Sequence, residues 1–356
     1  MRLAPLLLAA ALAAPAAAQA PAPWYGKGVQ SAQAVTVDRS QPIGARGVAA
    51  VGLTVANMDR SVRFYTDVLT FRLIADTTID APSLGRLVGV SNTHVRVARL
   101  QLGDERLELT QYLGGSGRVP PRDSRSNDRW FQHVAIIVSD MDRAFARLEA
   151  AGVQRASAGG PEELPGWNPN AGGIKAFYFR DPDGHPLEIL QFPVGKGLPK
   201  WHDATGPLFL GIDHTAIVVR NTERSLAFYR DVLGLSVAGR SDNYGPEQEH
   251  LNNVPGAHLR ITSLRGAEGP GVEFLEYLTP RDGRPYPTNE RATDLIHWQT
   301  RVLVPDVDLA TARLRAEGAP FVSVGAVSLA PGAIMEGGRG VEVRDPDGHV
   351  VQLIEP

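Results

Sequence analysis

Four residues of types that bind metal ions stand at corresponding places in the 356-residue sequence. His133 and His214 each lie in a short β-branched run, and Glu188 and Glu273 each lie in an apolar run further along the chain. If these runs are strands, each glutamate shares a face with apolar side chains, where an unpaired carboxylate is costly or stays protonated. A single histidine or glutamate in a strand is more often structural, but this recurrence indicates a shared role such as metal binding.

These residues belong to a sequence repeat. Residues 55–69 closely resemble residues 219–233, and residues 179–185 closely resemble residues 343–349, both at an offset of 164 positions. Each half divides again, because the strand, polar turn and amphipathic helix that begin near His133 recur after His214. The sequence therefore predicts an α+β protein made of four modules of the form β-α-β-β-β.

The module boundaries follow from the repeat. We expect a signal peptide at 1–20, a leader at 21–45, modules at 46–113, 129–193, 208–279 and 294–356, and a linker at 194–207. The Asp-Pro-Asp-Gly turns at 181–184 and 345–348 are expected to join the last two strands of the second and fourth modules. His185 and His349, which follow these turns, are expected at the surface.

Each module offers two positions for a polar ligand. The position in the first strand holds, from the first module to the fourth, Ala50, His133, His214 and Gln299. The position in the last strand holds Glu108, Glu188, Glu273 and Gln352. Because the second and third modules alone carry both His and Glu, we expect the first and fourth modules to be structural.

The repeat unit and three motifs resemble the vicinal oxygen chelate superfamily, which includes glyoxalases, extradiol dioxygenases and bleomycin-resistance proteins. The motifs are the strand at 213–219, the helix end at 228–235 and the hairpin at 181–189, and the resemblance covers nearly all of the mature chain. It implies that the modules pair into two cup-shaped mixed β-sheets flanked by helices. It also implies one divalent metal ion (Zn, Fe, Mn or Ni) held by residues of the first and last strands.

The sequence leaves two pairings of the modules open. Tandem pairing, of the first module with the second and the third with the fourth, separates His133 and Glu188 from His214 and Glu273. Crossed pairing, of the second module with the third and the first with the fourth, brings these four residues together as a complete ligand set. We favour crossed pairing, and the resemblance implies that Glu188 or Glu273 also acts as the catalytic base.

Substrate contacts are expected from a polar segment of the third module. We expect Tyr244, His250, Asn252 and Asn253 to contact a small-molecule substrate, because loops at the rim of a sheet often carry specificity. Turn formation explains the same composition equally well. The corresponding segment of the second module, residues 166–175, is expected to be a turn.

Three functions are compatible with these residues. We favour a metal-dependent enzyme of the isomerase or lyase type that chelates two neighbouring oxygens of a small substrate and moves a proton. The first alternative is an Fe²⁺ extradiol-type dioxygenase that uses His133, His214, one glutamate and His250 as a helper. The second alternative is a ligand-binding or resistance protein without catalysis.

The composition restricts partners and compartment. A formal charge of -3 and the lack of a Lys/Arg cluster argue against nucleic acid as a partner. The short apolar run at 3–18 predicts a cleaved signal peptide rather than a membrane anchor, and therefore an exported protein, periplasmic or secreted. The chain has no cysteine, which excludes thiolate ligands. Because one chain contains four modules, no oligomer is required to build two cups.

Overall fold

The computed structural model describes residues 38–115, 117–203, 206–331 and 338–356. The signal peptide predicted at 1–20 and most of the leader predicted at 21–45 lie outside these residues. No helix in the described part of the chain has the length and apolar character needed to cross a bilayer.

The first half of the chain contains two modules. The first consists of β1 (Gly47–Thr54), α1 (Met58–Arg63), the π-helical turn η1 (Phe64–Val68), β2 (Arg72–Asp80), α2 (Pro82–Val88), β3 (His94–Leu102) and β4 (Glu105–Tyr112). The second consists of β5 (Gln132–Val138), α3 (Met141–Ala150), β6 (Gln154–Arg155), β7 (Glu162–Glu163), β8 (Lys175–Arg180) and β9 (Pro186–Gln191). The 3₁₀ turn η2 (Pro199–His202) lies in the segment that leads to the second half.

The second half repeats this order. Its first module, the third of the chain, consists of β10 (Phe209–Val218), α4 (Thr222–Leu226), the π-helical turn η3 (Ala227–Val232), β11 (Ser236–Tyr244), α5 (Pro246–Asn252), β12 (His258–Arg265) and β13 (Gly271–Thr279). The fourth consists of β14 (Trp298–Leu303), α6 (Val307–Ala316), β15 (Val327–Ser328), β16 (Arg339–Arg344) and β17 (Val350–Glu355). The additional helices α2 and α5, in the first and third modules, were not part of the expected pattern.

The first helix of every module begins in the same way. An Asn or Asp at the N-cap accepts a hydrogen bond from the backbone N–H three residues later, which satisfies one of the free donors of the first turn. These caps are Asn57, Asp140, Asn221 and Asp306.

A side chain of the last strand anchors each helix start. The first helical N–H donates to this side chain at 2.9 to 3.0 Å, and the acceptors are Gln111, Gln191, Glu276 and Glu355. Each acceptor lies three residues after the polar position compared between the modules (Glu108, Glu188, Glu273 and Gln352). Because strand side chains alternate, these four polar residues face away from the helices, at one register in all four modules.

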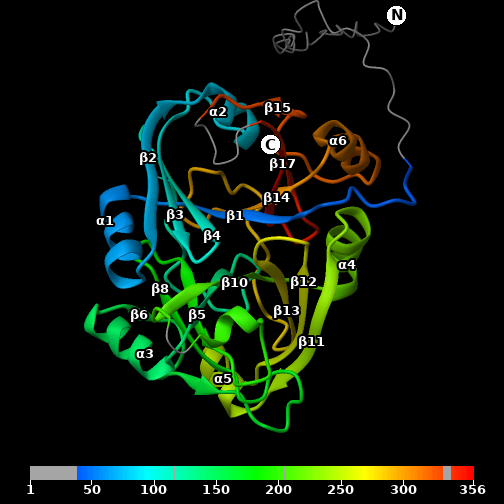
Figure 1. Cartoon of the computed structure of the whole chain (residues 1–356). Coiled ribbons are helices and arrows are strands. Elements are labelled where there is room, and N and C mark those ends of the chain that lie inside the picture. The colour runs from blue at the N-terminus through cyan, green and yellow to red at the C-terminus, as the bar shows by residue number, and fades with distance from the viewer. Residues whose placement is uncertain (1–37, 116, 204–205, 332–337) are drawn as a thin grey trace, which may run out of the picture. The chain divides into compact units, whose positions relative to one another are not determined.

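The modules form two mixed sheets, and the sheet order confirms crossed pairing (Figure 1). The order β11-β12-β13-β10-β5-β9-β8-β6 joins the third module to the second, and we name this sheet the 2–3 cup. The order β15-β16-β17-β14-β1-β4-β3-β2 joins the fourth module to the first, and we name it the 1–4 cup. In each cup the two first strands pair antiparallel, and each pairs in parallel with the last strand of its own module.

The apolar side chains beside the polar position pack under the helices. Leu187 and Ile189, on either side of Glu188, are fully buried in the main core together with the helix residues Leu148 and Leu226. This packing fixes the faces of β9, because a slip by one residue would bring the carboxylate into the core. The opposite face is left for the interior of the cup.

Each Asp-Pro-Asp-Gly turn makes a side-chain contact with a module of the other cup. The expectation that His185 and His349 are surface residues is wrong. His185 is 1% exposed, and its Nδ1 lies 2.8 Å from Asp181 Oδ2, which also accepts a hydrogen bond from the hydroxyl of Tyr65 at 3.2 Å. The second turn repeats these contacts with His349, Asp345 and Tyr229. Burial opposes protonation of both histidines, but the aspartates outweigh it and raise their pKa. The aspartate that begins each turn and the histidine that follows it are buried, and each aspartate contacts a helix residue of another module.

Candidate functional site

Three of the expected ligands converge in the 2–3 cup. His133 on β5, Glu188 on β9 and His214 on β10 each place one ligand atom within 4.8 Å of the others, and all three are buried. The Nε2 atom of His133 lies 3.2 Å from Glu188 Oε2, and the Nε2 atom of His214 lies 3.8 Å from the same oxygen. The antiparallel pairing of β5 with β10 produces this convergence, since it sets His133 opposite Ala216 and His214 opposite Ala135.

Glu273 on β13 approaches the same group from the side of His214. Its Oε1 atom lies 3.5 Å from His214 Nε2, and its Oε2 atom accepts a hydrogen bond from the hydroxyl of Ser263 at 2.5 Å. The side chain of Glu273 is 17% exposed, against 5% for Glu188. The structure therefore brings all four predicted ligands together. Of the two carboxylates, Glu273 is the more accessible.

The donor set fits a divalent metal ion. Both ring nitrogens of His133 and the Nε2 atom of His214 are buried without a hydrogen-bond partner among the described residues. Such atoms are rare in folded proteins, because a buried polar group without a partner costs free energy. Imidazole nitrogens beside two carboxylates are the ligand types of Zn²⁺, Fe²⁺, Mn²⁺ and Ni²⁺, and a bound cation would satisfy these nitrogens.

Asp213 orients His214. Its Oδ2 atom lies 3.0 Å from His214 Nδ1, and the same carboxylate accepts hydrogen bonds from Arg265 at 2.7 Å and from Trp201 at 2.8 Å. Burial acts to raise the pKa of Asp213. The contacts with His214, Arg265 and Trp201 outweigh the effect of burial, so the pKa of Asp213 is lowered. The contact occupies Nδ1 and leaves Nε2 for a ligand, which is the usual arrangement of a metal-binding histidine.

The charge of His214 reflects its carboxylate neighbours. Burial acts to lower its pKa, but Glu273, Asp213 and Glu188 outweigh this effect and raise it to about 9. Without a metal ion, His214 is therefore protonated near neutral pH. Metal binding must displace this proton, since the neutral imidazole is the ligand.

A cavity of about 280 Å³ opens beside these residues. Glu188, His214 and Glu273 are part of its lining. One wall is mainly apolar and comes from the second module, with Leu164, Ile174, Ala176, Leu190 and Phe192. The other wall is largely polar and comes from the third module, with Arg240, Ser241, Asn243, Gln248 and Ser263. A small ligand in this cavity would touch both the candidate metal ligands and a hydrogen-bonding wall.

The four residues expected to contact a substrate do not line this cavity. Tyr244 is half exposed and stacks on Trp167, with ring centroids 4.4 Å apart. His250 is exposed beside Glu162, and Asn253 ends α5 in the left-handed conformation with a φ of 53°. Asn252 is fully buried and donates to the hydroxyl of Tyr277 at 2.8 Å. These positions favour structural roles and lend no support to the prediction of direct substrate contact.

The same polar segment supplies two cavity residues that the sequence reasoning missed. Asn168 donates to Asn243 at 2.9 Å, Asn243 donates to Gln248 at 2.9 Å, and Gln248 donates to Asn252. The hydroxyl of Tyr277, which accepts from Asn252, ends this series of hydrogen bonds. Asn243 and Gln248 line the cavity. The spacing of Gln248 and Asn252 in α5 places them on one helix face, but no sequence signal separated the cavity residues from their neighbours.

The 1–4 cup carries an arginine at the place that corresponds to the candidate metal site. Arg301 pairs with Ala50 on one side and with Gln352 on the other. In the 2–3 cup, Ala135 pairs in the same way with His214 and Glu188, so Arg301 stands at the position of Ala135. Arg301 donates to Glu108 at 2.7 Å and to Gln352 at 3.2 Å. A fixed guanidinium therefore occupies the space between the counterparts of Glu273 and Glu188.

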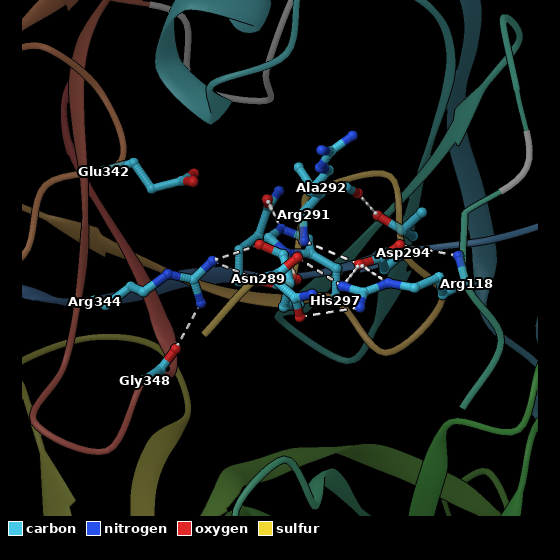
Figure 2. Close-up of polar contacts among 12 residues, drawn as sticks. Arg118, Asn289, Arg291, Ala292, Asp294, His297, Glu342, Arg344 and Gly348 are labelled. Carbon is cyan, nitrogen blue, oxygen red and sulfur yellow. Dashed lines mark hydrogen bonds and ion pairs between the residues drawn. The ribbon is translucent and has the colours of Figure 1, made fainter. Parts of the chain in front are cut away.

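Other buried polar residues lie in the 1–4 cup, and Figure 2 shows several of them. His297 lies 2.5 Å from Glu290, which also accepts a hydrogen bond from Arg344 at 2.5 Å. Arg344 donates in addition to the carbonyl of Gly348 at 2.8 Å, as Figure 2 shows. Glu342 extends from β16 into the same interior, where its Oε2 atom accepts a hydrogen bond from Gln352 at 2.7 Å. The histidine of this cup is thus held by the carboxylate of Glu290 and, at 3.2 Å, by the amide of Gln299.

Comparison with known proteins agrees with this architecture. The sequence model of the glyoxalase/bleomycin resistance protein/dioxygenase superfamily matches twice, at residues 47–189 and 211–353. A 2-epi-5-epi-valiolone epimerase from Actinomyces sp. is 34% identical over 157 residues, which are 43% of this chain and 82% of the epimerase. A lactoylglutathione lyase from Schizosaccharomyces pombe is 25% identical over 323 residues, which are 85% of this chain and 94% of the lyase.

Solved structures share the fold. The crystal structure of glyoxalase I from Zea mays superposes with a TM-score of 0.56 at 18% identity, covering 86% of this chain and 92% of the other. A putative dioxygenase from Bacillus subtilis superposes with a TM-score of 0.52 at 14% identity, covering 88% and 86%. Together with the two matches to the family model, these findings show that the chain belongs to the glyoxalase/bleomycin resistance protein/dioxygenase superfamily, the vicinal oxygen chelate proteins, with the family domain present twice.

Proposed function

We propose that this protein is a metal-dependent enzyme that removes and returns a proton at a carbon next to a carbonyl group of a small oxygenated substrate. The observation that carries this proposal is the convergence of two histidines and two glutamates beside a cavity, with imidazole nitrogens that have no hydrogen-bond partner among the described residues. When bound there, a divalent ion would supply Lewis-acid polarisation of two neighbouring substrate oxygens.

The two glutamates have different places in this scheme. Glu188 lies within the compact group with both histidines, so we assign it to metal binding. Glu273 is more exposed to the cavity, and the hydroxyl of Ser263 fixes one of its oxygens while the other stays near His214. We assign Glu273 as the group that takes the substrate proton and returns it.

The relatives support this reaction class. One is named an epimerase and another a lactoylglutathione lyase, and epimerisation next to a carbonyl consists of proton removal and return. We also propose that the protein acts after export, because the predicted signal peptide at 1–20 precedes the family domains.

Metal analysis with a matched pair of variants tests the metal site. His133→Ala should lose the divalent ion that the wild-type protein holds at about one per chain, because the imidazole is a ligand. Gln299→Ala changes the corresponding position in the 1–4 cup and should keep the ion. Equal metal content in the two variants would contradict the site.

Solvent exchange tests the role of Glu273. Glu273→Gln should retain the metal but slow deuterium incorporation next to the substrate carbonyl by about 10²- to 10⁴-fold, since it removes a general base. Unchanged exchange would refute this role.

Oxygen uptake with a catechol would instead favour a dioxygenase, for which the compact group of two histidines and Glu188 has the right composition.

A further inference from the structure

We propose that the substrate is a polyhydroxylated ketone of about five or six carbons, whose distal hydroxyl groups bind the amides of Asn243 and Gln248. This inference rests on the proposed function, because it assumes that the other end of the substrate lies at the metal ligands. It assigns a substrate class to the cavity from the register of its strands, the hydrogen-bonding capacity of its polar wall and the apolar part of its lining.

The strand register gives the length of the cavity. Glu273, Ser263 and Gly239 stand at one level of the sheet formed by β11, β12 and β13. Asn243, Leu259 and Tyr277 stand at another level, four residues further along β11 and β13. At about 3.3 Å per residue, the two levels are roughly 13 Å apart.

This separation sets the size of a ligand that reaches both levels. A metal–oxygen contact takes about 2 Å of it and a hydrogen bond about 2.9 Å, which leaves roughly 8 Å for the molecule. This distance runs from one substrate oxygen to another, and an extended chain advances about 1.3 Å per bond, so about six bonds and a skeleton of about five or six carbons span the gap. A three-carbon substrate would reach one level only.

The amides at the far level are fixed in orientation and retain unused capacity. The carbonyl of Asn243 accepts from Asn168 and its nitrogen donates to Gln248, which uses one of its two N–H groups. Gln248 is placed in the same way between Asn243 and Asn252. Among the described residues, each amide therefore keeps one N–H donor and one acceptor lone pair, and a hydroxyl group is a partner that both donates and accepts.

The apolar part of the lining suits the carbon skeleton of such a molecule. Leu164, Ile174, Leu190 and Phe192 line the same cavity as the amides. An extended polyol has C–H groups that bury well against such residues and hydroxyl groups that require polar partners. The cavity volume of about 280 Å³ is at the lower limit of ligand pockets, which favours a compact substrate.

A set of ketones that share the chelating oxygen pair tests the proposal. The metal-loaded protein would be assayed in D₂O for exchange next to the carbonyl with D-fructose, a five-carbon ketose, dihydroxyacetone and 2-hydroxycyclohexanone. The last two probes lack, respectively, the length and the additional hydroxyl groups. We expect kcat/KM for the longer ketoses to exceed that for both comparison probes by at least about 10-fold.

Gln248→Leu provides the decisive variant. It should reduce the ratio of ketose to 2-hydroxycyclohexanone kcat/KM by about 10- to 100-fold, because a buried hydrogen bond to the substrate is lost. Asn243→Ala should do the same. Gln154→Leu makes the same kind of change at an exposed position of β6, outside the cavity, and should leave the ratio unchanged.

The outcomes separate the two proposals. Equal rates with 2-hydroxycyclohexanone and the ketoses, or an unchanged ratio in both cavity variants, would overturn the substrate class and leave the proton-transfer function in place. Absence of exchange with every probe in the metal-loaded protein would overturn the proposed function and this inference with it.

Discussion

His214 shows how neighbouring residues prepare a single side chain for metal binding. Asp213 engages Nδ1, and Arg265 and Trp201 hold Asp213 in place. The remaining nitrogen, Nε2, then points to Glu188 and Glu273 without a hydrogen bond of its own. Second contacts of this kind set the tautomer of a ligand and commonly change metal affinity by about 10- to 100-fold.

The repeat predicted the four ligands but not the residues that support them. His133, Glu188, His214 and Glu273 were identifiable because the modules can be compared position by position. Asp213 lies next to a ligand, yet its role depends on Arg265, which is 52 residues away and reaches it only in the folded sheet. Contacts made across strands leave no local pattern in the sequence.

Glu342 provides a test of burial at the residue scale. Burial raises its pKa from the ordinary 4.5 to about 7, against the opposing effects of His297, Gln352 and Arg344, while Glu290 adds to the rise. Because the folded-state pKa is the higher one, the folded protein keeps this proton after the unfolded chain has lost it. The resulting stability is complete below pH 4.5 and is lost as the pH rises through 7.

Replacement of this carboxyl group should remove that pH dependence. We expect the free energy of unfolding of the wild-type protein to fall by up to about 3 kcal/mol relative to Glu342→Gln between pH 5 and pH 8. Urea unfolding of both proteins at four pH values measures the difference, and all other titrating groups are common to both. A constant difference across this range would contradict the assignment.

At the scale of elements, β14 and β5 show how one strand position can carry different chemistry. Ala135 on β5 leaves room beside the histidines of the 2–3 cup, whereas Arg301 on β14 extends between Glu108 and Gln352. The sequence comparison predicted the amides of the 1–4 cup but not this arginine, because it followed only the positions of the expected ligands. A cation was needed there, since Glu108 is 2% exposed.

Removal of the arginine should be more damaging than removal of the whole pair. Arg301→Leu should destabilise the protein by about 3–5 kcal/mol, because it removes the contact at 2.7 Å and leaves Glu108, among the described residues, with the longer contact to Arg99 at 3.4 Å. The double variant Arg301→Leu/Glu108→Leu should recover most of this loss. Urea unfolding of the single and double variants gives the coupling.

An exposed ion pair serves as the control for this cycle. Arg339→Leu breaks the contact with Asp308 at 2.8 Å, where both side chains are well exposed, and should cost less than about 1 kcal/mol. Additive effects of Arg301→Leu and Glu108→Leu would show that the two side chains do not depend on each other.

The expectation for the histidines that follow the hairpin turns failed at the same scale. A turn rich in Asp, Pro and Gly is typical of a surface, and the local sequence at 181–185 contains nothing that contradicts this. Asp181 and His185 are nevertheless buried, and Tyr65, from the helix of another module, contacts Asp181. The repeat could have indicated this contact, since Tyr229 and Asp345 show the same separation, but only the three-dimensional pairing gives it meaning.

At the scale of the whole molecule, crossed pairing makes the two sequence halves inseparable. The first half contributes β5 and β9 to the 2–3 cup and β1 and β4 to the 1–4 cup, and the second half completes both sheets. The sequence predicted the modules but left their pairing open, because strands of one kind recur in every module. Each half alone would expose two sheet edges and half of a metal site.

This arrangement predicts that the covalent link between the halves is dispensable once the protein has folded. Val194 is 97% exposed, so a protease site inserted after it can be cleaved without disturbing Trp201, which holds Asp213. The two fragments share interfaces that resemble a domain core cut in two, as in obligate complexes. We therefore expect the cleaved protein to elute as a 1:1 complex at micromolar concentration in size-exclusion chromatography and to keep its metal ion, as the uncleaved insertion variant does. Separation of the fragments would mean that the antiparallel pairs β5–β10 and β1–β14 are too weak to hold the cups together.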